Sequence, residues 1–462
     1  MNISVIGAGY VGLTTAACLA EIGHHVYCGE ADLAKLSQIR IGQLPFFEPN
    51  LEEIVTRNRS NGRLAFGTTE EAIDQNDVIF ICVGTPPLDN GEADLSAIEA
   101  VAKVIAKRAS GYRLIIEKST VPVQTGKQLS KHLAIHSGRT LKYDVVSNPE
   151  FLREGSAVED FFHPDRVVVG VESEKAADLM RAIYHPVIEA TVNCPAHVNC
   201  QRTRPRMMVT DTNSAELIKH ASNSFLAMKI SFANIVADLC EAAGANIVDV
   251  AEGVGLDSRI GPSFLNPGIG FGGFCFPKDL QAFVRIAEKF GCNFNLLKEV
   301  ERINQVRIEK FVGKITRELW TLRGKRICVW GLAFKPNTDD IRFAPSVAVI
   351  RGLLAEGAQV QAYDPQAMEK MKAELPGIKY CKDMYEAAEG ADVITVLTEW
   401  SEFRKASWAR LYDLVERPLV IDGRNALDAD ELTAHNFHYI GVGGLERMPT
   451  AAPSIAELSL SI

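Results

Sequence analysis

Asn-Ile-Ser-Val-Ile-Gly-Ala-Gly-Tyr-Val-Gly, residues 2–12, is the stretch that decides the fold of this 462-residue chain. A short β-branched run leads directly into three glycines with the spacing Gly-x-Gly-x-x-Gly, and a helical pattern follows up to Ala20. A second apolar run, His25 to Cys28, precedes the acidic Glu30. Strand, glycine turn, helix, strand and acid in this order indicate a dinucleotide-binding Rossmann unit.

Each part of this pattern has a chemical reason. The first glycine permits a tight turn, the second lets a pyrophosphate approach the backbone, and the third allows the helix to pack closely. The helix N-terminus then faces the phosphates. A carboxylate at Glu30 would accept hydrogen bonds from the adenosine ribose hydroxyls and repel a 2′-phosphate, so we expect NAD rather than NADP as the cofactor.

Further strands are predicted at the apolar runs Val78–Val83, Leu114–Glu117 and Tyr143–Ser147. Their alternation with helical segments predicts a parallel sheet with helices on both faces, whose ligands bind at the carboxyl ends of the strands. Three polar turns follow these strands: Gly84–Pro87, Ser119–Pro122 and Asn148–Gly155. Any one of them could be an ordinary loop, but together at one edge of a sheet they are typical of the walls of a site.

The middle of the chain is predicted to be helical. Ala215 to Ala243 contains no Gly or Pro and carries apolar residues at helical spacing, which indicates one long helix. Lys219 and Asn223 lie four residues apart in it and therefore share a face. Further helical patterns run through Ile247–Gly253, Asp279–Phe290 and Leu296–Leu322.

Inside this helical section lies Asn-Pro-Gly-Ile-Gly-Phe-Gly-Gly-Phe-Cys-Phe-Pro-Lys-Asp, residues 266–279. Glycines at this density let backbone approach a ligand closely. A thiol beside such a turn, followed by a cation and a carboxylate, suggests that Cys275 is an activated nucleophile. The alternative is a glycine-rich turn whose cysteine is a small buried hydrophobe.

The α/β pattern resumes at Lys325, but its first turn, after the run Arg326–Trp330, carries one glycine rather than three. This half can form a second doubly wound sheet and bind a different ligand. We therefore predict an α/β protein with two Rossmann-like doubly wound domains joined by a central helical domain. The predicted boundaries are 1–210, 211–322 and 323–462; residues from Glu446 on resemble a loose tail.

Bulk properties exclude several classes of protein. The net charge of −9 disfavours a nucleic-acid partner, and no apolar run is long enough to span a membrane. The apolar N-terminus lacks the positive residues of a signal peptide, since its first cation is Lys35. Ten scattered cysteines then indicate reduced thiols in a cytoplasm. Cys194, His197 and Cys200 could hold a metal, but no fourth ligand is evident, so we expect a loop and no metal.

A cysteine nucleophile allows covalent capture of an aldehyde, a step that a simple alcohol dehydrogenase does not need. A thiolate can trap a product aldehyde as a thiohemiacetal, from which a second hydride leaves as a thioester forms. Hydrolysis of the thioester then needs a carboxylate base. Cys275, Lys219, Asn223 and Asp279, with the glutamates of the turn at residues 148–155, supply these group types.

The chain resembles the UDP-glucose 6-dehydrogenase family of nucleotide-sugar dehydrogenases from Met1 to about Gly443. The resemblance rests on a series of motifs in family order: GAGYVG, VGTPP, STVPV, NPEFLREG, AELIKHASNSF, GFGGFCFPKD around the cysteine, GLAFKPNTDDIR, AYDP and DGRN. It implies a four-electron oxidation of UDP-glucose to UDP-glucuronate with two NAD, and a homodimer or higher homo-oligomer with no nucleic-acid or membrane partner.

The resemblance also implies roles for individual residues. Cys275 would be the nucleophile, Lys219 and Asn223 would stabilise the oxyanion and position a water, and Asp279 would support proton transfer. Glu150 would be the base for thioester hydrolysis, with Thr120 holding the water. The cofactor contacts would be Gly7, Gly9, Tyr10, Val11, Gly12, Glu30, Lys35, Thr85, Thr120, Glu154, Lys278 and Arg342. The substrate contacts would be Glu150, Phe151, Leu152, Arg153, Glu154, Lys219, Asn223, Arg259, Phe264, Leu265, Asn266, Pro267, Gly268, Gly272 and Lys335, with Arg259 reaching across from a neighbouring subunit.

The chain departs from the family pattern at four places. Glu30 stands where the family usually has Asp, and Phe274 replaces a small Ser before the cysteine. Phe343 follows Arg342 where an acidic residue is common, and residues 192–209 look like an insertion.

Three other functions stay open at this point. The substrate could be a UDP-N-acetylhexosamine or GDP-mannose. The chain could be a two-electron hydroxyacid dehydrogenase of the 6-phosphogluconate type, which has no need for Cys275 or a second α/β domain. It could also be a nucleotide-sensing scaffold whose site is spoiled by Phe274.

Overall fold

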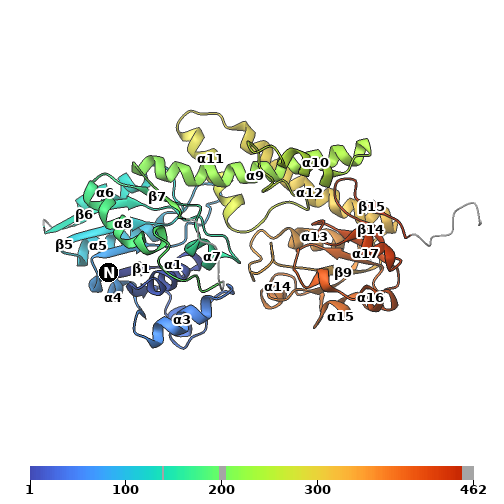
Figure 1. The fold of residues 1–462 in the computed structure, drawn as a ribbon, viewed down its shortest axis with the longest axis horizontal. Coiled ribbons are helices and arrows are strands. Elements are labelled where there is room, and N and C mark those ends of the chain that lie inside the picture. The colour runs from blue at the N-terminus through green and yellow to red at the C-terminus, as the bar shows by residue number, and fades with distance from the viewer. Residues whose placement is uncertain (138–139, 197–203, 450–462) are drawn as a thin grey trace, which may run out of the picture. The chain divides into compact units, whose positions relative to one another are not determined.

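The structure, a computed structural model, describes residues 1–137, 140–196 and 204–449. The chain forms two compact units, Met1–Asn223 with Lys278–Asn293, and Ser224–Pro277 with Phe294–Ile462. Each unit is built around one β-sheet flanked by helices (Figure 1). The predicted boundaries 1–210, 211–322 and 323–462 stay a prediction.

The first unit contains an eight-stranded sheet with the order β3-β2-β1-β4-β5-β6-β7-β8. Its strands are β1 (Asn2–Ile6), β2 (His25–Gly29), β3 (Leu64–Gly67), β4 (Val78–Ile81), β5 (Gly111–Glu117), β6 (Leu141–Ser147), β7 (Arg166–Gly170) and β8 (Arg206–Thr210). Its helices are α1 (Tyr10–Glu21), α2 (Leu33–Arg40), α3 (Leu51–Ser60), α4 (Thr69–Gln75), α5 (Ser96–Arg108), α6 (Thr125–His136), α7 (Ala157–Phe162) and α8 (Glu174–Ile188). Apolar side chains of α1, α3 and α8 pack in one buried cluster against the sheet, and those of α5 and α6 in another. Alternate strand residues such as Phe80 and Ile79 point into these two clusters, so the sheet is covered on both faces.

The predicted strands of the first sheet pair in parallel, and a further strand that was not predicted, β7, runs against its neighbour. Strands β6 and β7 pair antiparallel, at Ser147 and Gly170, whereas the other pairs in this sheet are parallel. The connecting helix α7 has six residues and rises only about 9 Å. The last residue of β7 pairs with the last residue of β6, so β7 begins beyond the end of β6 and runs back towards it.

Helix α9 (Thr212–Ala243) confirms the long helix predicted from Ala215 to Ala243, and it crosses from the first unit into the second after Asn223. Within the second unit it packs against α12 (Asn295–Leu319), where Ser231 Oγ donates to the Val300 carbonyl at 3.1 Å and Arg307 pairs with Asp238. Helix α10 (Ile247–Gly255) follows α9, and α11 (Cys275–Lys289) precedes α12.

The second sheet has the order β11-β10-β9-β12-β13-β14-β15 and is parallel except for its last pair. Its strands are β9 (Arg326–Trp330), β10 (Gln359–Tyr363), β11 (Lys379–Tyr380), β12 (Val393–Val396), β13 (Leu419–Asp422), β14 (His438–Ile440) and β15 (Glu446–Arg447). The helical segments around it are α13 (Pro345–Ala355), α14 (Met368–Glu374), α15 (Met384–Ala388), η1 (Phe403–Lys405), α16 (Trp408–Leu414) and α17 (Ala429–Ala434). The fully buried Trp330 stacks on Phe403 with ring centroids 5.2 Å apart, at the centre of this core.

Two segments differ from their predicted form. Residues 446–447 belong to the predicted tail but form the edge strand β15, and residues 450–462 lie outside the described part of the chain. The segment 192–209 was predicted as a loop, yet its end contributes to β8. Of the possible metal ligands there, Cys194 is buried, while His197 and Cys200 lie outside the described residues.

In the part of the chain that the structure describes, no helix has both the length and the apolar character that a membrane span requires.

Candidate active site

The glycine turn between β1 and α1 has the geometry that a bound pyrophosphate needs. Gly7 adopts a φ of 99°, and a Cβ on Gly12 would lie 1.8 Å from the Gly7 carbonyl oxygen, so neither position accepts a side chain. A Cβ on Gly9 would meet nothing within 4 Å, so open space lies beside the backbone there. Gly9 also caps α1 without any side-chain hydrogen bond. Because the first N–H groups of a helix attract anions, this turn fits the phosphates of a dinucleotide.

Glu30 follows β2 beside that turn. Its carboxylate accepts hydrogen bonds from the N–H groups of Ala8 and Asp32 at 3.0 Å, and it forms an ion pair with Lys35 at 2.6 Å. Burial by itself would raise the pKa of Glu30, but the hydrogen bonds from Asp32 and Lys35 outweigh it and lower that pKa. The residue is therefore an anion, with the charge that ribose hydroxyls require and a 2′-phosphate does not tolerate.

Two of the three polar turns are tied together. Thr85 is buried, and its hydroxyl donates to the Thr120 carbonyl oxygen at 2.9 Å. The turns at residues 84–87 and 119–122 therefore hold each other at the ends of β4 and β5, as the strand pattern predicted.

The third turn carries Glu150, which is 5% exposed. Its Oε1 lies 3.1 Å from the Nζ of Lys219 on α9, and its Oε2 accepts the Leu152 N–H at 2.7 Å. The neighbouring Phe151 ring lies 5.4 Å from the Lys219 Nζ and 4.0 Å from the Arg166 guanidinium. A carboxylate, an ammonium and an aromatic ring thus meet in a nearly dry environment.

Asp279 joins this group from α11 and is 1% exposed. The Asn223 amide donates to its Oδ2 at 2.6 Å, and the Lys278 Nζ lies 2.8 Å from its Oδ1. Burial by itself would raise the pKa of Asp279, but the charges of Lys278 and Lys219 outweigh it and lower that pKa. The structure therefore brings together five of the predicted residues: Glu150, Lys219, Asn223, Lys278 and Asp279.

The remaining residues of the turn at 148–155 are also held in place. The Arg153 guanidinium pairs with Asp160 at 2.5 Å, and Glu154 is 8% exposed. Both were predicted as ligand contacts. The pair with Asp160 holds Arg153 within the turn, and the predicted role of Arg153 in binding substrate stays a prediction.

In the second unit, side chains from surrounding elements pin the glycine-rich loop that leads to Cys275. The Asn234 amide oxygen accepts the Gly268 N–H at 2.8 Å, and Asn304 bonds both the N–H and the carbonyl of Phe271, at 2.8 and 2.9 Å. The Arg424 guanidinium donates to the Gly270 carbonyl at 2.9 Å. The loop before the thiol is thus rigidly tied.

Cys275 is half-buried and is the first residue of α11. The sequence placed the start of this helix at Asp279, which was wrong. Pro277 has no N–H to donate and is tolerated in a first turn, so the helix can begin before it. Asp279 follows Cys275 by four residues and shares its side of the helix.

Other predicted residues of the second unit take varied positions. Leu265 is buried, Phe264 adopts a left-handed φ of 64°, and the Lys335 Nζ lies 5.3 Å from the Phe334 ring. The Arg259 side chain is 87% exposed and pairs with Asp257 at 2.6 Å, so no site in its own unit encloses it.

Three family models match the chain in order. They describe the NAD binding domain, the central domain and the UDP binding domain of the UDP-glucose/GDP-mannose dehydrogenase family, and they match residues 1–188, 213–306 and 328–429. The chain is 43% identical over 454 residues to UDP-glucose 6-dehydrogenase YwqF of Bacillus subtilis, and the match covers 98% of this chain and 100% of that protein. The chain belongs to the UDP-glucose/GDP-mannose dehydrogenase family.

Further similarities agree with this membership. The UDP-glucose 6-dehydrogenase of Rhizobium meliloti is 42% identical, with 96% of this chain and 99% of that protein covered. A solved UDP-glucose dehydrogenase from the archaeon Pyrobaculum islandicum superposes with a TM-score of 0.85 at 38% identity, covering 96% and 98% of the two chains. The predicted family and the predicted fold class are confirmed, and NAD is the cofactor.

One buried contact of this family member could not be anticipated from its motifs. Glu48, 4% exposed, accepts hydrogen bonds from the Tyr10 hydroxyl and from the N–H groups of Gly155 and Ala157, the latter two at 2.7 Å. It therefore connects the glycine turn to the end of the turn that carries Glu150. Residues this far apart in the sequence give no local signal of their contact.

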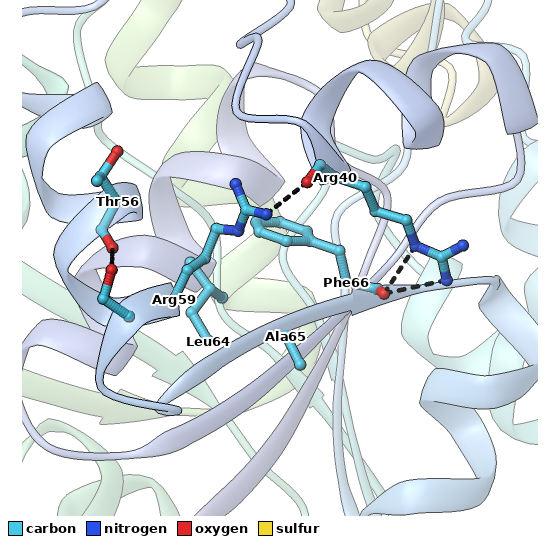
Figure 2. Close-up of a pocket in the computed structure, with 7 residues that line it drawn as sticks. Arg40, Thr56, Arg59, Leu64, Ala65 and Phe66 are labelled. Atoms are coloured by element: carbon cyan, nitrogen blue, oxygen red, sulfur yellow. Dashed lines mark hydrogen bonds between the residues drawn. The ribbon is translucent and has the colours of Figure 1, made fainter.

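A pocket of about 540 Å³ opens elsewhere on the first unit, beside the edge strand β3. Figure 2 shows Arg40 and Arg59 in it, with Arg40 donating to the Phe66 carbonyl and Arg59 to the Arg40 carbonyl. It contains none of the predicted site residues, and both guanidinium groups already have partners within the protein. We assign it no part in the active site.

Proposed function

We propose that the protein oxidises UDP-glucose to UDP-glucuronate in two successive steps that use NAD. The observation that carries the proposal is the buried group of Glu150, Lys219, Asn223 and Asp279, the last of which lies one helical turn from Cys275. These are the side chains that a thioester route needs, as nucleophile, oxyanion donors and general base. The family's UDP binding domain at residues 328–429 supports a UDP-sugar as the substrate.

In the proposed mechanism, NAD held by the glycine turn and Glu30 would supply the hydride acceptor for each of two oxidations. After the first, the Cys275 thiolate attacks the aldehyde carbon, so a C–S bond forms and the carbonyl oxygen gains the negative charge. Lys219 and Asn223 donate to this oxygen, which lowers the barrier because their charge and dipole are fixed beforehand. Departure of the second hydride converts the thiohemiacetal into a thioester, which leaves Cys275 acylated.

Hydrolysis completes the reaction. Glu150 takes a proton from a water that attacks the thioester carbon, the C–S bond breaks, and the thiolate of Cys275 is restored. Thr120 would hold this water, and Asp279 would assist proton transfer. The Lys219 ammonium, 3.1 Å from Glu150, holds this carboxylate in place within the buried group.

The substrate contacts are proposed by family resemblance. They comprise residues 150–154, Lys219, Asn223, residues 264–268, Gly272 and Lys335. The family model that matches is shared with GDP-mannose dehydrogenases, so GDP-mannose and UDP-N-acetylhexosamines are the rival substrates. Full-length similarity to UDP-glucose 6-dehydrogenases favours UDP-glucose.

We propose a homodimer or a higher homo-oligomer in a cytoplasm. Phe225, Phe232 and Leu239 recur every seven residues along α9 and are 58%, 58% and 65% exposed, so they form an apolar stripe. A second copy is the partner that would cover it, and the exposed Arg259 would then reach the neighbour's substrate. Seven of the described cysteines, namely Cys18, Cys28, Cys82, Cys240, Cys292, Cys328 and Cys381, are free thiols, which supports a reducing compartment.

The test uses Cys275→Ser with UDP-glucose and NAD. We expect NADH production to fall by about a thousand-fold or more, because no thioester can form, and mass spectrometry should detect a partly oxidised sugar nucleotide. Cys292→Ser is the matched control, since Cys292 is exposed and outside the proposed site. Full activity of Cys275→Ser would exclude the mechanism, and one NADH per substrate in the parent would indicate a two-electron enzyme.

Parallel assays with GDP-mannose and UDP-N-acetylhexosamines test the choice of substrate. Faster turnover of one of these nucleotide sugars would contradict the proposal of UDP-glucose as the substrate.

A further inference from the structure

Phe274, the large residue directly before Cys275, lies under a guanidinium group. The Arg342 Cζ is 4.3 Å from the centroid of the Phe274 ring, which is the geometry of a cation–π contact. Asp340 holds that guanidinium in a fork, accepting from its Nε at 2.9 Å and from its Nη2 at 2.6 Å. The Asp340 carboxylate also accepts the Arg342 N–H at 2.9 Å, so the arginine is fixed at both ends.

The backbone of the same segment encloses the residues before the thiol. The Gly273 N–H donates to the Arg342 carbonyl at 3.1 Å. A Cβ on Gly272 would lie 2.2 Å from the Phe343 carbonyl oxygen, so the two backbones are in direct contact. Phe343 has a left-handed φ of 52°, a conformation that persists only where surrounding contacts hold it.

We propose that Phe274 and Arg342 act as a positioning pair that fixes the direction of the Cys275 thiol. The inference rests on the proposed function, in which Cys275 is the nucleophile. Phe274 stands where the family usually has a small residue, and its contact with Arg342 holds the turn through the side chain. The hydrogen bond from the Gly273 N–H to the Arg342 carbonyl holds the turn through the backbone. Arg342 was predicted as a cofactor contact, and that role stays a prediction beside the one proposed here.

Two conservative substitutions separate this role from simple space filling. Phe274→Leu keeps an apolar side chain but removes the aromatic face, and Arg342→Lys keeps the charge but removes the planar fork. A loosened turn should expose the thiol and misalign it. We therefore expect each variant to react about three-fold faster with iodoacetamide at Cys275 and to show a kcat about three-fold lower, the size expected of a partly exposed cation–π pair.

The double variant decides whether the residues act as a pair. If they do, Phe274→Leu/Arg342→Lys should match the single variants, whereas independent effects would multiply to about nine-fold. Phe274→Leu should leave the KM for NAD unchanged, since only the thiol is displaced. Alkylation is followed on the Cys275 peptide by mass spectrometry, which separates it from the exposed Cys292.

Matched controls test for general destabilisation. Phe290→Leu changes a half-exposed phenylalanine, and Arg351→Lys changes an arginine paired with Glu374; both should leave alkylation of Cys275 unchanged. Parent-like alkylation in Phe274→Leu, or multiplying effects in the double variant, would overturn the positioning pair. Because alkylation needs no substrate, a parent without activity on UDP-glucose would contradict the proposed function alone and leave this test intact.

Discussion

Glu150 and Lys219 form an ion pair from which water is almost excluded. Their side chains are each 5% exposed, and the Nζ to Oε1 distance is 3.1 Å. Removing the charge of Lys219 would leave the Glu150 carboxylate buried without this cation, so Lys219 is sensitive to substitution. The same low exposure strengthens the electrostatic attraction between the ammonium and the carboxylate, because fewer water molecules screen the two charges.

Glu150→Gln should separate the second half of the reaction from the first. Glutamine has nearly the same size and can still accept a hydrogen bond, but it cannot take a proton from water. We expect a burst of NADH at normal rate, then turnover slower by about a hundred-fold or more, with the acylated Cys275 accumulating. Stopped-flow absorbance and intact-protein mass would measure both.

Glu174→Gln is the control for this substitution, since Glu174 is exposed on α8. Unchanged steady-state turnover in Glu150→Gln would show that another group is the base. Loss of the burst as well would place Glu150 in the first oxidation, and a melting curve would exclude unfolding as its cause.

At the scale of elements, Glu216 connects the long helix α9 to the start of α6. It is 2% exposed, and its carboxylate accepts the N–H groups of Gln124 at 2.6 Å and Gly126 at 2.7 Å. Burial raises the pKa of Glu216 to about 7, although these two N–H groups act to lower it. The folded protein therefore holds a proton on this carboxyl at pH values where the unfolded chain has lost it.

The consequence is a pH dependence of stability with a defined sign. A folded pKa above the unfolded value means that the contribution of Glu216 is complete below pH 4.5 and is lost as pH rises towards 7. The free energy of unfolding of the parent, minus that of Glu216→Gln, should thus be larger at pH 5 than at pH 8. The slope in between cannot exceed about 1.4 kcal/mol per pH unit, the value for one proton.

Urea denaturation at the two pH values measures this difference. The exposed Glu174→Gln serves again as the control and should show the same difference from the parent at both pH values. A difference for Glu216→Gln that grows with pH would reverse the sign and contradict the raised pKa.

Elements with a strong local pattern could be predicted from the sequence, and those without one could not. The glycine turn is fixed by its three spaced glycines, and α9 and the buried strands by their repeating apolar residues. Strand β8 was not predicted, because the residues Arg206–Thr210 are mostly exposed and lack the pattern of a buried strand. The start of α11 was predicted wrongly, because a proline such as Pro277 usually marks the end of a helix. Here Pro277 lies within the first turn of α11.

The candidate site divides in the same way. Helical spacing alone placed Lys219 beside Asn223, and motif resemblance supplied Glu150 and Asp279. No pattern could show the contact of Tyr10 with Glu48, which are 38 residues apart, or of Glu48 with Gly155, which are 107 apart. Such contacts exist only once the sheet has brought its loops together.

At the scale of the whole molecule, the apolar stripe of α9 sets the proposed assembly. Phe225, Phe232 and Leu239 lie on one face of a 32-residue helix, where exposed large apolar side chains are costly for a monomer in water. A two-fold contact would place the same stripe of each copy against the other, so every substitution acts twice.

Phe232→Glu should convert the parent oligomer to monomers. Each copy would lose the burial of one phenylalanine, worth about 2 kcal/mol, and would gain a carboxylate facing its counterpart. Two such losses weaken a dimer by about a thousand-fold. Analytical ultracentrifugation at several concentrations measures the dissociation constant, with Phe290→Glu as the control because Phe290 is 50% exposed and follows the last residue of α11. A Phe232→Glu protein that stays oligomeric would move the interface off α9. If the Phe232→Glu protein is monomeric but folded, its turnover should fall as the oligomer dissociates, because Arg259 would no longer reach a neighbouring substrate. Turnover should return at protein concentrations high enough for the copies to associate again.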